Sequence, residues 1–298
     1  MALRYPFILL KKAFGNLYLL MFLNGFLLAS LFYFRMQSSY ENGLFASVKA
    51  SIDNKIDADD THDSVATKAM NACHYLMSNR ASIFEGTDML GPEADLFHSA
   101  TTDLMTTRGA CGSYALVLAR LMDAYGYPVR IAQMKAGGIY GAHNVVEVKT
   151  GPSWIVLDPT FNVTFIRPDA RLASFADVRR NWSYYAGQVP KEYNPAYRYE
   201  DVRYTNWEKV PVLLPAFKAL LNLTLGTQRT NTLSLRTWLL KIYTVYFYCI
   251  LLFYIPVVLL TFRRLIQTKV FPNQDIPFTF SNLVKYSRDL LRGSSYIH

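Results

Sequence analysis

Two long, uncharged, apolar runs constrain this chain more than any other feature of its sequence. They occupy residues 13–34 and 242–262. Each is long enough to cross a bilayer as a helix, which requires about 20 apolar residues. The composition agrees, because only 18% of the 298 residues are charged and the mean hydropathy is +0.09. We therefore predict a transmembrane helix at each run, with the lipid bilayer as a partner.

The basic residues that flank these runs predict the orientation, because Lys and Arg are enriched on the cytoplasmic side of membrane proteins. Three precede the first run and six follow the second: Arg4, Lys11, Lys12, Arg263, Arg264, Lys269, Lys285, Arg288 and Arg292. We expect a two-pass protein of the cytoplasmic (inner) membrane, with a cytoplasmic N-terminus at 1–12 and a basic cytoplasmic tail at 263–298. Residues 36–241 then form an extracytoplasmic domain. The reverse orientation would place this domain in a reducing compartment.

Charge and cysteine content exclude several classes of protein. Most of the formal net charge of +9 lies on the two ends of the chain, so the central domain lacks the basic surface that nucleic acids require. The three cysteines are too few for a disulfide scaffold, and His62, His74 and His98 do not have metal-ligand spacing. We expect no nucleic-acid partner, no metal and no cofactor.

The central domain alternates helical and extended patterns, with a core expected at about residues 60–165. Apolar residues at helical spacing follow a cluster of capping residues near Asp60, and a second helix extends from about Cys111 to Tyr125, before Gly126 and Pro128. Three strand-like runs follow: Val129–Met134, His143–Lys149 and Trp154–Asp158. This order predicts an α+β fold in which helices pack on an antiparallel sheet.

The last two predicted strands are joined by a turn signal, Thr-Gly-Pro-Ser. If the turn is centred between Gly151 and Pro152, Asp158 faces Val145 and becomes a diagonal neighbour of His143, within reach of its side chain. A turn of odd length would instead send the two side chains to opposite faces of the sheet.

Three residues in this domain form a candidate catalytic site: Cys111, His143 and Asp158. A thiol at a helix N-terminus experiences the positive end of the helix dipole, which lowers its pKa and increases the fraction of reactive thiolate. His143 is the candidate general base, and Asp158 is the carboxylate that would orient the imidazole.

The same residues carry a resemblance to a known family. The stretches RGACGSYALVLARLMDAYGYPVRIAQM, GAHNVVEV and SWIVLDPTFN, within about residues 105–162, resemble the transglutaminase-like superfamily of papain-like cysteine enzymes, in a membrane-anchored form of bacterial type. The resemblance implies that Cys111 is the nucleophile, His143 the base and Asp158 its orienting partner. It implies acyl transfer through a thioester. The family's second oxyanion-hole donor is left unassigned.

These observations lead us to expect a membrane-anchored cysteine hydrolase, a protease or amidase that acts on a peptide or other amide-bearing substrate of the cell envelope. Two alternatives remain. An amine-acceptor transglutaminase would use the same residues. A catalytically idle accessory membrane subunit would instead bind a protein partner, which could itself be a membrane protein, or a surface polysaccharide through the aromatic-rich run 181–207.

Overall fold

The computed structural model describes residues 16–84, 97–107, 109–209, 212–269, 284 and 288. The chain divides into two compact units, one of Met1–Ser38 with Tyr243–His298 and the other of Ser39–Ile242. Several basic residues used to predict the orientation lie outside the described residues: Arg4, Lys11, Lys12, Lys285 and Arg292. The orientation therefore stays a prediction.

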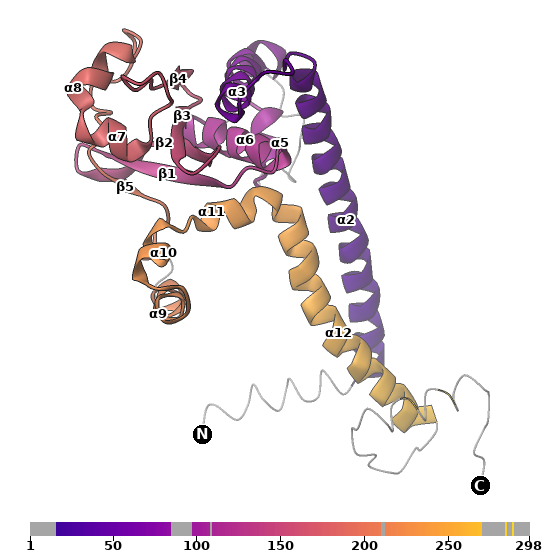
Figure 1. Cartoon of the computed structure of the whole chain (residues 1–298). Coiled ribbons are helices and arrows are strands. Elements are labelled where there is room, and N and C mark those ends of the chain that lie inside the picture. The colour runs from indigo at the N-terminus through magenta and orange to yellow at the C-terminus, as the bar shows by residue number, and fades with distance from the viewer. Residues whose placement is uncertain are drawn as a thin grey trace. The chain divides into compact units, whose positions relative to one another are not determined.

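The first unit contains most of the two long apolar helices, α2 (Leu17–Asp53) and α12 (Ile242–Lys269) (Figure 1). Both are long and apolar enough to cross a membrane. Asn24 donates a hydrogen bond to Thr261 at 2.6 Å, and the hydroxyls of Ser38 and Thr244 are 2.7 Å apart. The two helices therefore run antiparallel, joined by polar pairs of the kind that stabilise helix association in lipid. Helix α2 does not end with the predicted span at Phe34 but continues to Asp53.

The second unit is built on a five-stranded antiparallel sheet of order β4-β3-β2-β1-β5. Its strands are β1 (Val129–Ala136), β2 (Ile139–Lys149), β3 (Trp154–Asp158), β4 (Val163–Thr164) and β5 (Val202–Arg203). The three predicted strands are present, β1 and β2 being longer than expected. The α+β class and the antiparallel sheet predicted from the sequence are confirmed.

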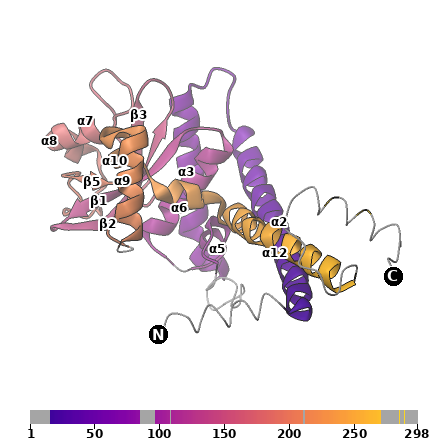
Figure 2. The ribbon, with the colours of Figure 1, turned by 90° about the horizontal axis from the view of Figure 1, so that it is seen from below.

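One face of the sheet is covered by helices α3 (His62–Phe84), α5 (Ala100–Leu104) and α6 (Cys111–Ala124) (Figures 1 and 2). Alternate strand residues, including Val146, Val148 and Leu157, point into this core. Helix α6 contacts both β1 and β2. It packs against them through apolar side chains such as Leu118 and Leu121, which are fully buried.

The opposite face carries a second, more aromatic core. It includes Val145 and Val156 from the sheet, and aromatic residues from the run 181–207. This side also contains α7 (Phe175–Arg180), α8 (Trp182–Tyr185) and the short 3-10 helix η1 (Ala186–Gln188). Tyr199 is fully buried against Phe165 and Trp182. Much of the aromatic-rich run is therefore packed within the domain.

The core extends beyond the predicted limits of 60–165 at both ends. Phe45 and Ile52 of α2 are buried with the residues of α3 and α6. The buried guanidinium of Arg120 lies over the ring of Phe45, with Nε 3.7 Å from the carboxylate of Glu41. The described residues between β5 and α12 include α9 (Leu213–Leu225), α10 (Thr227–Thr232), α11 (Leu235–Trp238) and the 3-10 helix η2 (Leu239–Lys241).

Candidate active site

The strand pair β1–β2 contains an irregularity next to His143. Met134 pairs with His143, but the next pair is Lys135 with Tyr140, so Gly141 and Ala142 are extra residues on β2. Gly141 has a φ of +86°, a conformation that glycine adopts without strain. Bulges of this kind bend a strand and redirect the side chains beside them. Here the bulge immediately precedes the candidate base.

The hairpin β2–β3 has the register predicted from its turn. Val146 pairs with Leu157 and Lys149 with Trp154. His143 and Asp158 are consequently on the same face, and Nε2 of His143 is 2.7 Å from Oδ2 of Asp158. Both side chains are almost completely buried. The diagonal contact predicted from the sequence is therefore confirmed.

Cys111 is the first residue of α6, as predicted, and its side chain is partly exposed. The imidazole of His143 also lies close enough to the Cys111 thiol for the two groups to shift each other's pKa, so His143 interacts with both Cys111 and Asp158. The structure thus brings the three predicted site residues together in the order thiol, imidazole, carboxylate. This is the arrangement in which a base activates a nucleophile and a third group orients the base.

The electrostatics of the pair favour a charged thiolate and a charged imidazolium. Burial alone would raise the pKa of Cys111, but hydrogen bonds from His143 and Asn144 outweigh it and lower the pKa below the ordinary value. Burial alone would lower the pKa of His143, but its hydrogen bonds with Asp158 and Cys111 raise the pKa to about 9. At pH values between the lowered pKa of the thiol and the raised pKa of the imidazole, the thiol is deprotonated and the imidazole is protonated, so both groups carry charge.

Asp158 is fixed by groups on several elements. Its Oδ1 accepts hydrogen bonds from the backbone N–H of Thr160 at 3.1 Å and of Phe161 at 3.4 Å. The hydroxyl of Tyr193 donates to Oδ2 at 3.0 Å. A carboxylate with several donors of this kind is held in one orientation and is compensated for its burial.

Aromatic rings enclose the imidazole. The ring of Tyr197 is stacked on His143, with centroids 4.4 Å apart and an interplanar angle of 8°. Phe161 and Tyr193 complete the enclosure at centroid distances of 5.7 and 6.4 Å. These roles of Tyr193 and Tyr197 were not predicted. The only sequence signal was their place in the aromatic-rich run, which has no fixed spacing from His143.

A side-chain amide and a guanidinium lie beside the thiol, and neither was predicted. Asn144 Nδ2 donates to Sγ of Cys111 at 3.5 Å, and Nη1 of Arg236 donates to Oδ1 of Asn144 at 3.3 Å. Asn144 immediately follows His143 and lies on the opposite face of β2, so the hairpin prediction would have placed it near α6. Arg236 is on α11, nearly 100 residues along the chain, and no local pattern indicates its position.

The loop before Cys111 is held by a buried network. Arg80 donates to the backbone oxygens of Asp103 at 2.7 Å and Gly109 at 2.9 Å. The hydroxyl of Ser113 donates to Oδ1 of Asp103 at 2.7 Å. These bonds connect α3, α5 and the first turn of α6, and they fix the backbone that presents the thiol.

Cys73 and the three histidines considered in the sequence have structural partners. Cys73 is fully buried, and burial raises its pKa, while Cys249 lies on α12. The histidines His62, His74 and His98 contact Tyr127, the Pro159 carbonyl and Asp103, respectively. Within the described part of the chain, no cluster of His, Cys, Asp and Glu side chains is suited to hold a metal ion.

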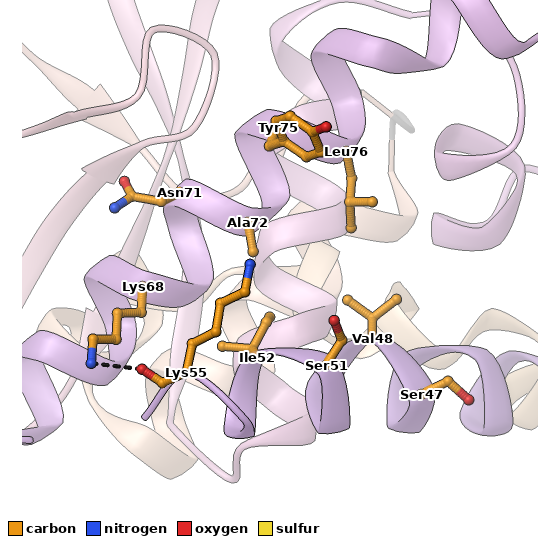
Figure 3. Close-up of a pocket in the computed structure, with 10 residues that line it drawn as sticks. All are labelled: Ser47, Val48, Ser51, Ile52, Lys55, Lys68, Asn71, Ala72, Tyr75 and Leu76. Atoms are coloured by element: carbon orange, nitrogen blue, oxygen red, sulfur yellow. Dashed lines mark hydrogen bonds between the residues drawn. The ribbon is translucent and has the colours of Figure 1, made fainter. Parts of the chain in front are cut away.

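A groove of about 670 Å³ lies between the C-terminal part of α2 and helix α3 (Figure 3). Its walls are mostly apolar, with Val48, Ile52 and Leu76 among them, and Lys68 is bonded to the backbone oxygen of Lys55 at 2.8 Å. None of the predicted site residues lines this groove. The candidate chemistry is therefore at the N-terminal end of α6 and not here.

We predict that Gly109→Ala destabilises the loop that presents Cys111. Gly109 and Gly138 have nearly the same φ, +86° and +85°, so alanine at either position incurs a left-handed backbone cost of about 1–2 kcal/mol. At Gly109 the new Cβ would also lie 1.9 Å from Oγ of Ser113, whereas at Gly138 it meets nothing within 4 Å. Displacing Ser113 from Asp103 adds about 1.5–3 kcal/mol. Denaturant unfolding of the two variants measures the difference, and equal losses would contradict this account.

Comparison of the chain with models of known protein families, with curated proteins and with solved structures finds no match. The assignment of function therefore depends on the geometry of the site.

Proposed function

We propose that this chain is a membrane-anchored cysteine hydrolase of the transglutaminase-like type, which cleaves an amide or peptide bond in a substrate of the cell envelope. The observation that carries the proposal is the connected set of Cys111, His143 and Asp158, in which a partly exposed thiol meets a buried imidazole bonded to a buried carboxylate. The order of helix, hairpin and site residues along the chain supports the transglutaminase-like assignment.

The residues support a two-step acyl transfer. The Cys111 thiolate attacks the substrate carbonyl, and the His143 imidazolium gives its proton to the departing amine, leaving a thioester. Water then attacks the thioester while neutral His143 takes a proton from that water, so a carboxylic acid is released and the Cys111 thiolate and His143 imidazolium are restored. Asp158 holds the imidazole in one orientation and stabilises its charged form.

Two hydrogen-bond donors are available for the oxyanion that forms in each step. The backbone N–H of Cys111 belongs to the first turn of α6, where N–H groups have no intrahelical acceptor. The side-chain amide of Asn144, 3.5 Å from Sγ, is the second donor in our proposal. Donors placed in this way stabilise the transition state by several kcal/mol.

The proposal includes an orientation for the protein. Helices α2 and α12 would cross the cytoplasmic membrane with both termini in the cytoplasm, so that the domain Ser39–Ile242 meets substrates outside. An anchor of this kind keeps an enzyme close to a substrate that is itself confined near the membrane.

We expect Cys111 to react with iodoacetamide at lower pH than an ordinary thiol. Because its pKa is lowered, the midpoint of the labelling-rate profile should lie below about pH 8.5, the pH at which an unperturbed thiol is half protonated. The full chain is labelled in detergent across pH 5–10, and mass spectrometry assigns the product to Cys73, Cys111 or Cys249.

Turnover, in contrast to the labelling rate, should fall as pH rises through about 9, because His143 then loses the proton that the leaving amine needs.

The alternatives predict other outcomes. If Cys111 is inert or titrates like a free thiol, the hydrolase proposal is wrong, and an idle subunit that binds a partner is the better account. An amine-acceptor transglutaminase shares the labelling profile but yields an amide product when a primary amine is supplied with the substrate.

A further inference from the structure

The guanidinium of Arg236, which has no carboxylate partner among the described residues, lies next to the candidate nucleophile. Nη1 of Arg236 is bonded to Oδ1 of Asn144, whose Nδ2 contacts Sγ of Cys111. Arg236 is exposed as a whole residue, but its guanidinium is partly desolvated, and this bond uses one of the five N–H donors of that group. The remaining donors are therefore available to a molecule that approaches Cys111.

A second arginine adds to the positive charge. Partial burial is the largest effect that lowers the pKa of Arg236, and repulsion from Arg203 on β5 lowers that pKa further. Arg203 donates to Oε1 of Gln133 at 3.0 Å and lies over the ring of Tyr140. Among the residues that the structure describes, no Asp or Glu forms an ion pair with either arginine.

Several other arginines of the domain have carboxylate partners. Arg130 is paired with Glu147 at 2.8 Å, and Arg120 with Asp123 at 3.2 Å. The charge of the Cys111 thiolate is already balanced by the His143 imidazolium. The two neighbouring arginines, which have no carboxylate partner among the described residues, therefore give the site an excess of positive charge. An anion bound there would relieve the repulsion between the two guanidinium groups.

We infer that Arg236, supported by Arg203, binds a carboxylate that the substrate carries beside its scissile amide bond. The guanidinium fork matches a carboxylate in a bidentate geometry, and its contact with Asn144 places that carboxylate a short distance from Sγ. The substrates would thus be acidic amides or peptides. This inference rests on the proposed function, because it names the substrate class of the same site.

The test compares alkylation of Cys111 by iodoacetate, which carries a carboxylate, with alkylation by the neutral iodoacetamide. Both reagents form the same S–C bond and release iodide, and both require the thiolate. The ratio of their rates therefore cancels the thiolate fraction and reports on the charge around Sγ. The full chain is used in detergent at low ionic strength, because salt screens the interaction.

We expect Arg236→Gln to lower the iodoacetate-to-iodoacetamide ratio by about 3- to 10-fold, as the loss of one charge near the thiol implies at intermediate dielectric. Arg236→Lys keeps the charge and should stay within about twofold of the wild-type ratio. Arg229→Gln, on the exposed surface of α10, is the matched control that removes the same charge elsewhere and should leave the ratio unchanged.

An unchanged ratio in Arg236→Gln would overturn the inference, as would an equal decrease in Arg229→Gln. Folding is monitored within the same experiment, because Cys73 is fully buried and stays unlabelled in the folded domain. Failure of the hydrolase proposal is distinct: it appears as slow, free-thiol-like reaction of wild-type Cys111 with iodoacetamide, whatever the ratio of the two reagents.

Discussion

Replacing Cys111 with alanine is expected to abolish hydrolysis of any amide or peptide that the wild-type chain cleaves, with a decrease in kcat of at least about 1000-fold. The residues of such a site act as a unit, so loss of the nucleophile removes both the thioester and the use of His143 as acid and base. The fold should be preserved, because the Cys111 side chain is only partly buried and alanine is tolerated in the first turn of a helix.

Cys73→Ala is the control for this experiment. Cys73 is fully buried in the core between α3 and α6, so its loss should lower stability by creating a small cavity while leaving kcat unchanged. Turnover and thermal unfolding of both variants are measured on the full chain in detergent. Hydrolysis at the wild-type rate in Cys111→Ala would exclude Cys111 as the nucleophile.

Replacing His143 with glutamine is expected to slow iodoacetamide labelling of Cys111 at pH 6–7 by about 10- to 100-fold. The imidazolium lowers the pKa of the thiol, so without it the thiolate fraction at these pH values should fall and the labelling profile should move to higher pH. Glutamine is preferred to alanine because its amide leaves a hydrogen-bond donor for Asp158. Alanine would remove one donor from this buried carboxylate, and the loss of a hydrogen bond to a charged group costs about 1.5–3 kcal/mol.

His74→Gln provides the comparison for this variant. A ring nitrogen of His74 is 2.9 Å from the backbone oxygen of Pro159, the residue that follows Asp158. The His74→Gln variant therefore tests whether any nearby histidine affects the thiol. We expect the labelling profile of His74→Gln to match that of the wild type. A profile unchanged in His143→Gln would show that His143 does not activate Cys111.

The sequence predicted the parts of the site that depend on local pattern. The helix beginning at Cys111 and the turn at Gly151 and Pro152 were recognisable, and the even turn alone determined that His143 and Asp158 share a face. Residues that return to the site from distant parts of the chain were not predictable. Tyr193, Tyr197 and Arg236 reach it through irregular segments, whose path depends on packing and not on periodicity.

The bulge before His143 was predictable only in part. The cluster of Gly137, Gly138 and Gly141 indicates irregular backbone near the start of β2, and all three have positive φ. The sequence does not show which residues are unpaired, because that depends on how β1 and β2 align on both sides of the hairpin. The length of α2 was also not predicted. After Phe34 most residues are polar, and the apolar residues that face the core occur only at intervals, so this part of the helix has no continuous apolar pattern.

The long α2 helix determines where a water-soluble version of the domain Ser39–Ile242 must begin. Phe45 and Ile52 are part of the core, and Glu41 lies beside the buried Arg120, yet all three precede the helix that opens the recognisable part of the domain. A fragment starting near Asp60 would expose the apolar surfaces of α3 and α6 to water and leave Arg120 without this carboxylate. Its inactivity or aggregation would reveal an incomplete folding unit and would carry no information about Cys111. A fragment of Ser39–Ile242, the second compact unit, retains these contacts and is the better starting point for crystallisation or NMR.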